Sequence, residues 1–350
     1  MSESHFLKRR WKVIVNIATL TAMAVLIYAV REELAQTIDN LRKVNLWVLA
    51  LLIPIEALNH DSYARMFRSL FGIVGHKLHY KDMYKVSLEL NMVNHIFPSG
   101  GVSGFSYFSL RMKQFDVSTG KSTLVQTMKF VCLFISFEVM LIFGLLALAI
   151  GGQASNVVIL LAGSLATSLV IGTLGIAYVI GSERRIDSFF TTITRGLNRG
   201  IHYLRRKNPE TINILKLKGM LFDLHENYLL IKSDYRKLKG PLLNGLMANL
   251  TEILAVYIVY VAFGYWFNPG AIILAYAVAN FAGLVSVMPG GVGIYEALMT
   301  AVLATAGLSP AVTIPVTVMY RMLNTVIQVA PGYYFYHRAL HGRSAPKHAA

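Results

Sequence analysis

Two short motifs rich in proline and glycine interrupt apolar stretches of this sequence, and a cation follows each motif at a similar distance. The first motif spans residues 98–104 (PSGGVSG), and the second spans residues 289–293 (PGGVG). Lys129 lies 31 residues after the first proline, and Arg321 lies 32 residues after the second. Because guanidinium offers a phosphate two parallel hydrogen bonds and ammonium offers a point charge, this pattern predicts a site that grips an anion from two sides.

The motif residues themselves suit such a site. Proline removes a backbone donor and glycine weakens a helix, so each motif is predicted to end one helix and start another. Helices that begin at Gly101 and Gly291 would present positive dipole ends and free N–H groups to an anion. The motif residues predicted to bind substrate are Pro98, Gly100, Gly101, Ser103, Pro289, Gly290, Gly291 and Gly293.

Acidic residues within the apolar stretches allow another explanation of the two cations. A charge at the centre of a membrane costs roughly 2.5–3.5 kcal/mol on insertion scales, so it needs a partner or a function. Lys129 and Arg321 could each neutralise an acid, with Glu138 and Glu296 available. Two further acids precede the two prolines by 42 and 37 residues. Structural ion pairing is an equal alternative for the residues predicted to serve proton or ion coupling, which are Glu56, Glu138 and Glu252.

Several enzyme motifs are incomplete in this sequence. Ser103 lies in a G-x-S-G pattern that is typical of intramembrane serine proteases, but no histidine lies on a later apolar stretch to act as its base. His76, His79 and His95 have no carboxylate or cysteine at ligand spacing, so we expect no metal and interpret them as solvated loop residues. The sequence has no P-loop. We therefore expect neither an enzyme nor a cofactor.

Composition indicates the class of protein. The 350 residues are 55% hydrophobic and only 15% charged, whereas soluble domains carry about 25% charged residues. Runs of 18 or more mostly apolar residues recur, so we predict an all-α polytopic membrane protein. The net charge of +15 is concentrated between the apolar runs, which favours the positive-inside rule over nucleic-acid binding.

We predict about six transmembrane helices and two re-entrant helical hairpins. The predicted spans are Val13–Val30, Leu46–Leu70, Ser122–Ile150, Val157–Ile180, Pro241–Gly264 and Ala311–Tyr336. The arms of the hairpins are Val86–Phe97 with Val102–Leu110, and Ala271–Val287 with Gly291–Ala306. These arms are shorter than the ~20 residues that a membrane-spanning helix needs, so we expect each pair to enter and leave on one side.

Loop charges predict the topology. Lys and Arg cluster before the first span, around residues 76–85 and 111–121, between spans four and five, and after the last span, so we expect these parts and both termini in the cytoplasm. The flanks of the second hairpin carry neither residue and are expected outside. Repeat 1 (46–150) and repeat 2 (241–338) then have opposite orientations within a single membrane domain, 1–350. This inverted repeat would bring the two hairpin tips together near the midplane, as in transporters.

Residues 182–240 form the one long polar segment and are predicted to be a basic cytoplasmic helical segment. Apolar residues recur every three or four positions from Phe190 to Leu204, with arginines between them. Such a helix suits the surface of an anionic leaflet. A solvated helical hairpin that packs on its own second half is the equal alternative.

The second motif continues as PGGVGIYE at residues 289–296, and Tyr320-Arg321 follows on the last predicted span. With these residues and the PSGGVSG motif, nearly the whole sequence resembles the lysylphosphatidylglycerol synthase transmembrane-region family. This family is the flippase-like module of the bacterial multiple peptide resistance factor. The resemblance implies a substrate-binding role for Glu296 and Tyr320, and for Arg111, which fits the basic residues that the family has after its first motif.

The first motif departs from the family pattern. The family's first repeat commonly has an acidic residue after the glycine pair and Glu-Arg on the next span. This sequence has Val102-Ser103 and Met128-Lys129 at those places.

The resemblance implies movement of a phospholipid or lipid-linked headgroup across the membrane. In the resistance factor, a soluble aminoacyl-transferase domain follows the membrane module, whereas this sequence ends 14 residues after the last predicted span. We therefore expect a stand-alone flippase-type transporter of the cytoplasmic (inner) membrane, which holds the phosphate of an anionic lipid between the hairpin tips. The alternative is a membrane-embedded accessory subunit that presents a lipid to a separate glycosyl- or aminoacyl-transferase. The expected partner is a membrane lipid and not nucleic acid. The sequence leaves open whether the protein also forms a homo-oligomer or binds a separate transferase.

Overall fold

The computed structural model describes residues 44–96, 102–152, 156–189, 235–285 and 293–341, together with a few isolated positions. Every regular element in these ranges is helical, which confirms the predicted all-α class. In chain order the α-helices are α3 (Leu46–Leu49), α4 (Leu52–Ile73), α5 (Tyr80–Ile96), α6 (Val102–Met112), α7 (Thr119–Ile150), α8 (Asn156–Ile180), α11 (Lys239–Ala262), α12 (Pro269–Val285), α13 (Ile294–Thr305) and α14 (Pro310–His341). Two short 3-10 helices, η1 (Lys113–Phe115) and η2 (Tyr235–Leu238), precede α7 and α11.

Several predicted features lie outside the described residues. These features are most of the first span at residues 13–30, the tips of both hairpins at residues 97–101 and 286–292, residues 193–228 of the basic segment, and the tail from residue 342. They stay predictions.

Three helices in the described part of the chain are long and apolar enough to cross a membrane. They comprise Thr119–Ile150 (α7), Ala162–Val179 (within α8) and Arg236–Ala262 (η2 with α11). The apolar segments Pro269–Asn280 of α12 and Ile294–Thr305 (α13) are shorter than a membrane span, as expected for the arms of the predicted hairpin. α4 is long enough to cross a membrane but carries four charged residues. The chain is therefore a membrane protein with several apolar helices, and the predicted count of six spans stays a prediction.

The largest differences from the predicted helix boundaries are in the first two described elements, at the start of α5 and at the end of α14, which continues to His341 instead of ending at Tyr336. The span predicted at Leu46–Leu70 is divided into α3 and α4, and α4 continues to Ile73. The first arm of the first hairpin begins at Tyr80 instead of Val86. The additional turns of α5 contain Lys81, Asp82 and Lys85, so an apolar run could not indicate them.

The same turn geometry ends α4 and α11. Gly75 has φ +81° and Gly264 has φ +84°, a left-handed conformation that glycine adopts without steric cost. Each glycine stands five residues before the next helix, since α5 begins at Tyr80 and α12 at Pro269. The two halves of the chain therefore connect their first two helices in the same way.

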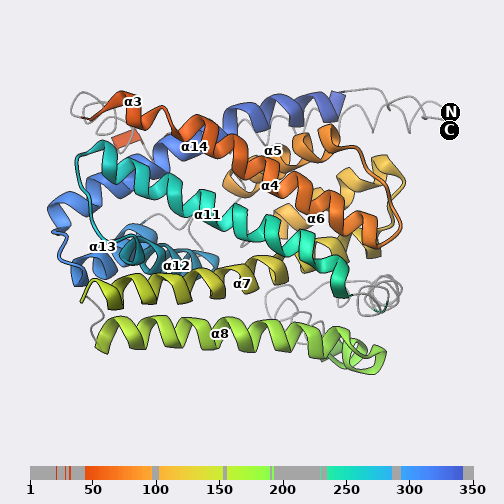
Figure 1. The fold of residues 1–350 in the computed structure, drawn as a ribbon. Coiled ribbons are helices and arrows are strands. Elements are labelled where there is room, and N and C mark those ends of the chain that lie inside the picture. The colour runs from red at the N-terminus through yellow and green to blue at the C-terminus, as the bar shows by residue number, and fades with distance from the viewer. Residues whose placement is uncertain are drawn as a thin grey trace, which may run out of the picture.

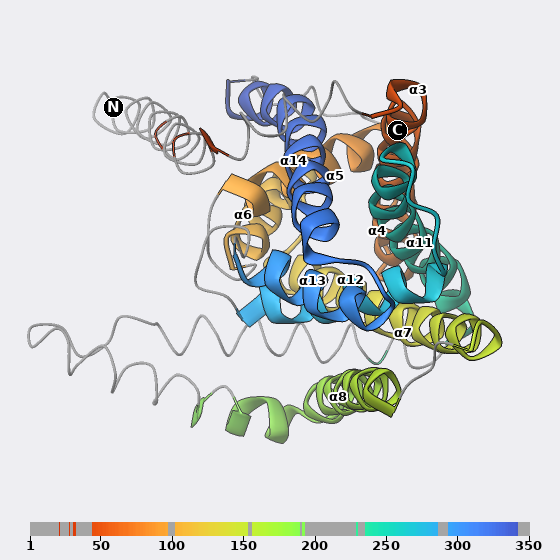
Figure 2. The same cartoon turned by 90° about the vertical axis from the view of Figure 1, so that its left-hand side faces the viewer.

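The helices of the two halves pack against each other in an exchanged pattern (Figures 1 and 2). α4 of the first half lies along α11 of the second half. α5 packs against α14, while α12 packs against α7, so the first helix of each hairpin contacts the last helix of the other half. α8 lies on the outer side of α7. The predicted inverted repeat and its boundaries stay predictions.

Glycines allow both exchanged contacts to be close. A Cβ atom on Gly332 of α14 would lie 2.5 Å from the Cβ atom of Met92 and 2.6 Å from the carbonyl oxygen of Leu88, both on α5. On the other side, a Cβ atom on Gly270 of α12 would overlap the carbonyl oxygen of Gly144 on α7. Neither contact leaves room for a side chain.

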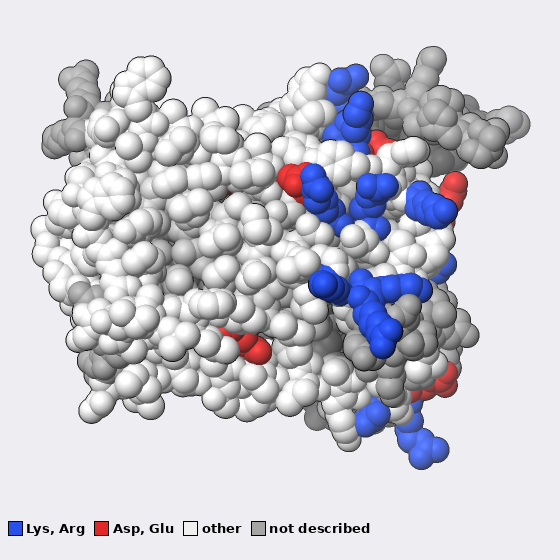
Figure 3. Space-filling view, viewed as in Figure 1, with Lys and Arg blue, Asp and Glu red and all other residues white. Residues whose placement is uncertain are grey.

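Charge is distributed along the bundle as expected for a membrane protein. On the face shown in Figure 3, lysines and arginines gather at one end, and the rest is uncharged apart from an isolated acidic group. The ends of α4 and α8 and the start of α11 lie at the basic end (Figure 1). The apolar part suits contact with hydrocarbon, and the basic end suits the cytoplasmic leaflet that the sequence predicts.

Candidate functional site

A buried carboxylate, Glu56, and a half-buried one, Glu252, lie where α4 and α11 pack together. Glu56 on α4 is 3% exposed and accepts a hydrogen bond from Nε2 of Gln328 at 2.8 Å. Glu252 on α11 accepts hydrogen bonds from the hydroxyl of Tyr63, at 3.0 Å, and from the hydroxyl of Tyr276. The two acids lie close enough to interact electrostatically. Neutral polar side chains therefore provide the hydrogen bonds of these two carboxylates, which were predicted to serve in coupling. Neither carboxylate forms an ion pair within the described part of the chain.

A chain of polar side chains on one face of α14 extends from Glu56. Nε2 of Gln328 also lies 2.8 Å from Oδ1 of Asn324, and Nδ2 of Asn324 donates to the hydroxyl of Tyr320 at 3.2 Å. These three residues are spaced by four, which places them in a row along a helix. Gln328 was not predicted from the sequence, although the four-residue spacing of polar residues on an apolar helix is a signal that identifies it.

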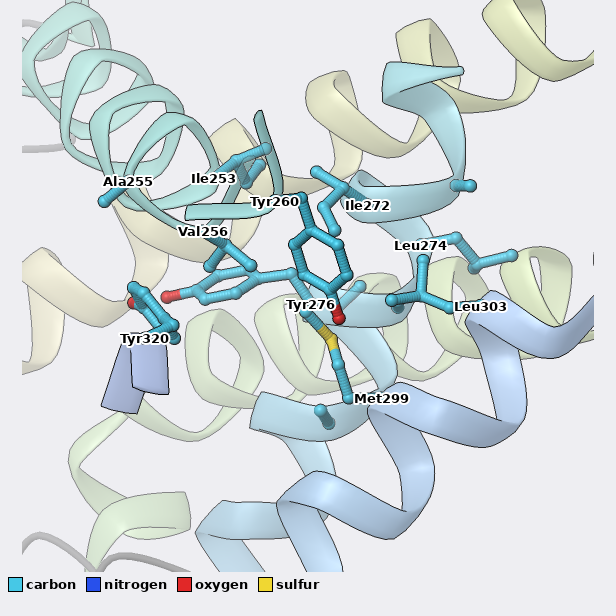
Figure 4. Packing of buried hydrophobic residues seen from close by; sticks show 14 of the residues in the cluster. Ile253, Ala255, Val256, Tyr260, Ile272, Leu274, Tyr276, Met299, Leu303 and Tyr320 are labelled. Atoms are coloured by element: carbon cyan, nitrogen blue, oxygen red, sulfur yellow. The ribbon is translucent and has the colours of Figure 1, made fainter. Parts of the chain in front are cut away.

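The hydroxyl groups of this network are set in a dense apolar cluster (Figure 4). Tyr276 of α12 and Tyr320 of α14 lie close together there, near Met299 of α13. Tyr260 of α11 belongs to the same cluster, and its hydroxyl lies 2.9 Å from Oγ1 of Thr317. Helices α11, α12, α13 and α14 thus surround these hydroxyl groups with mainly apolar side chains.

Arg321 forms an ion pair with Glu296 on α13. The guanidinium donates through Nη1 to Oε1 of Glu296, and the two side chains are 13% and 14% exposed. The other carboxylate oxygen, Oε2, accepts the backbone N–H of Gly293 at 2.7 Å. The carbon at the centre of the guanidinium lies 5.0 Å from the ring centroid of Tyr295. The pairing that the sequence allowed as an alternative is therefore the arrangement in the structure.

Lys129 lies in a different environment from Arg321. Its side chain is 6% exposed, and Nζ lies 4.3 Å from the ring centroid of Phe130 and 5.9 Å from those of Tyr63 and Phe67. Buried cation–π contacts of this kind contribute about 2 kcal/mol. Glu252 is its electrostatic partner, at a distance beyond that of an ion pair. Lys129 is thus buried and Arg321 nearly so, and of the two only Arg321 is neutralised by an adjacent acid.

Arg111 belongs to an ion pair within the first hairpin. Its Nε donates to Oε2 of Glu89 at 2.8 Å, and the hydroxyl of Tyr107 donates to the same oxygen at 2.7 Å. Glu89 on α5 is 1% exposed, whereas Arg111 and Tyr107 lie on α6. This pair joins the two arms of the hairpin. Glu89 was not predicted from the sequence, although it lies in the predicted hairpin arm Val86–Phe97.

We expect Arg111→Ala to lower the free energy of unfolding by roughly 3–5 kcal/mol, because it leaves Glu89 buried without a charged partner. Arg65→Ala is the matched control, because Arg65 pairs with Asp61 at an exposed site where ion pairs contribute little. Thermal unfolding of both variants in detergent measures the difference. Equal midpoints for the two variants would show that the pair with Glu89 is not structural.

The other predicted residues are located as follows. Ser103 is the second residue of α6 and is half-buried. Oε1 of Glu138 on α7 is buried and has no hydrogen-bond partner among the described residues. The remaining motif residues lie outside the described ranges, namely Pro98, Gly100, Gly101, Pro289, Gly290 and Gly291.

The interpretation of the histidines as solvated loop residues was wrong for His95. It lies in the last turn of α5, and its Nδ1 is 2.9 Å from the carbonyl oxygen of Asn91. His76 lies in the loop before α5 but is half-buried, and its Nε2 is 3.2 Å from Nζ of Lys121. Partial burial lowers the pKa of His76 below its ordinary value, and the Lys121 ammonium lowers it further. No group of three metal-ligating side chains occurs in the part of the chain that the structure describes.

Comparison with known proteins identifies relatives that are also membrane proteins. The chain is 25% identical over 109 residues to a UPF0104 membrane protein of Pyrococcus horikoshii, which covers 31% of this chain and 32% of that protein. It is 27% identical over 119 residues to a UPF0104 membrane protein of Methanothermobacter thermautotrophicus, which covers 34% of each. The chain thus matches about a third of the length of these curated relatives.

A family model gives a longer match. The model of the lysylphosphatidylglycerol synthase transmembrane region matches residues 13–332, which include both halves of the bundle, both proline–glycine motifs and Arg321. The chain belongs to the lysylphosphatidylglycerol synthase transmembrane-region family.

Proposed function

We propose that this protein is a flippase-type transporter that moves an anionic phospholipid or lipid-linked headgroup across the cytoplasmic membrane. The observation that carries the proposal is the ion pair between Arg321 on α14 and Glu296, which lies three residues after the second proline–glycine motif. The proposal assigns transport, and no catalytic step, to this chain. Family membership and the buried polar groups in a membrane bundle support it.

Glu296 shows which anion chemistry this site accepts. Its carboxylate binds the Arg321 guanidinium on one oxygen and the Gly293 N–H on the other. A lipid phosphate also presents several acceptor oxygens and a negative charge, so it satisfies the same two donors. In the proposed mechanism, the phosphate replaces the Glu296 carboxylate on Arg321 as the lipid headgroup enters.

Displacement of Glu296 has an electrostatic consequence. A carboxylate that is 14% exposed and loses its cation is destabilised unless it takes a proton or finds another donor. Uptake of a proton by Glu296 would therefore accompany headgroup binding, and its release would accompany re-formation of the ion pair. This exchange is a means by which a proton gradient could drive transport.

The buried groups beside Arg321 suit a path for a polar headgroup. Tyr320 precedes Arg321, and the row of Asn324 and Gln328 leads from it to Glu56. Lys129 provides a second buried cation, held by aromatic rings and not by an adjacent carboxylate. A headgroup that leaves Arg321 would meet further hydrogen-bonding groups in place of hydrocarbon.

The proposal is tested with purified full-length protein in vesicles of phosphatidylcholine that contain fluorescently labelled phosphatidylglycerol. Dithionite bleaches only the label in the outer leaflet, so transport increases the bleached fraction above that of protein-free vesicles. Labelled phosphatidylcholine is the control for unspecific movement. An unchanged bleached fraction with the anionic label would overturn the flippase proposal and favour an accessory role beside a separate transferase.

A further inference from the structure

A groove on the outer surface of the bundle lies where α11 crosses α7, separate from Arg321. It has a volume of about 590 Å³, within the range of about 300–1,000 Å³ that is typical of small-molecule sites. Its lining residues come from α7, η2 and α11, and they are Ile135, Ser136, Val139, Arg236, Lys239, Leu242, Leu243 and Leu246.

The wall of this groove is apolar. Leu243 and Val139 are exposed hydrophobic residues of α11 and α7. The one hydroxyl among the lining residues belongs to Ser136, and its oxygen lies 2.6 Å from the carbonyl oxygen of Cys132 and 3.2 Å from that of Leu242. Because this hydroxyl is satisfied by the backbone, the wall requires no polar occupant. Both α7 and α11 are long and apolar enough to cross a membrane, so we expect the apolar wall of the groove to lie against hydrocarbon.

Two cations line the same groove. Arg236 lies on η2 and Lys239 is the first residue of α11, and both side chains are exposed. Neither makes an ion pair with a carboxylate of the described residues. They belong to the basic end of the bundle, where the start of α11 lies (Figures 1 and 3). Cations at this position attract anionic headgroups, and their long side chains extend toward the membrane surface.

We propose that this groove binds one anionic phospholipid of the surrounding bilayer, with an acyl chain against α7 and α11 and its phosphate between Arg236 and Lys239. The apolar wall matches an acyl chain, and the paired cations match a headgroup with a net negative charge. A zwitterionic lipid satisfies the wall but leaves net positive charge at the basic end. The site is independent of the Arg321–Glu296 pair, so it does not rest on the proposed transport.

The test uses the full-length protein in phosphatidylcholine vesicles with a trace of phosphatidylglycerol that carries a photoreactive diazirine near the end of one acyl chain. After irradiation, peptide mass spectrometry locates the adducts. We expect adducts concentrated in residues 135–139 and 242–246. The double variant R236Q/K239Q should reduce them several-fold, while Lys113→Gln, an exposed cation outside the groove, should not.

Two further variants distinguish lipid bound in the groove from lipid that contacts the protein elsewhere in the bilayer. Val139→Trp fills the groove and should reduce the adducts, whereas Ile171→Trp on the exposed face of α8 should not. The Arg321→Ala variant should label normally even when it transports no lipid. Adducts spread evenly over α8 and α7, or adducts that are unchanged in R236Q/K239Q, would overturn the proposal. Adducts concentrated in residues 193–228 instead would also overturn it, because that segment of the chain would then separate the lipid from the groove.

Discussion

Arg321→Ala is expected to abolish lipid movement, and Arg321→Lys is expected to lose most of it. Lysine keeps the charge but lacks the planar fork that binds two phosphate oxygens at once. Arg321→Ala also leaves Glu296 without its cation at a site where both side chains are nearly buried, so the free energy of unfolding should fall by roughly 3–5 kcal/mol. The dithionite assay measures transport, and thermal unfolding in detergent measures stability.

The double variant R321A/E296Q separates the two roles of Arg321. Removing both charges should restore most of the stability, because no unpaired charge remains in the protein interior. Transport should remain absent, because the phosphate has lost its guanidinium. Normal transport by R321A/E296Q would show that the pair is only structural, and the phosphate-binding role of Arg321 would be wrong. The single variant Glu296→Gln should still bind lipid, but its lipid transport should no longer respond to a proton gradient.

Gly332→Leu is expected to prevent the packing of α5 against α14 and to abolish both folding and transport. Even the first atom of a side chain at this position would lie 2.5 Å from the Cβ atom of Met92 and 2.6 Å from the carbonyl oxygen of Leu88. The backbone oxygen cannot rotate away, so the helices must separate. Overpacking of a core costs about 1–3 kcal/mol or more, and here a whole side chain has no space.

Gly163→Leu on α8 is the matched control, because no atom lies within 4 Å of a Cβ atom built at Gly163. Both variants replace a helical glycine with a larger, better helix former, so they differ only in the space available. The folding and stability of the two variants are compared by size-exclusion chromatography and by their thermal unfolding midpoints. A Gly332→Leu protein as stable as the Gly163→Leu protein would contradict the exchanged packing of the two halves.

Helix positions could be predicted from the sequence because apolar runs and helix breakers are local signals. The predicted spans Ser122–Ile150, Val157–Ile180 and Pro241–Gly264 agree with α7, α8 and α11 to within three residues at each end. Ser118 accepts the N–H of Lys121 at the start of α7, an N-cap that the apolar run does not show. Where polar residues continue a helix, as in the first turns of α5, hydropathy indicated too short an element.

The sequence by itself determined that the chain is an all-α membrane protein and which polar residues its membrane-embedded helices must accommodate. Only the tertiary structure decided the partners of these residues. Glu56 and Gln328 are 272 positions apart, and Arg111 pairs with Glu89 although other acids lie in the spans. A helix pattern places a side chain on a face but does not say which helix covers that face. Hydrogen bonds and buried ion pairs act over about 3–4 Å, so only the packing of the helices selects which donor meets which carboxylate.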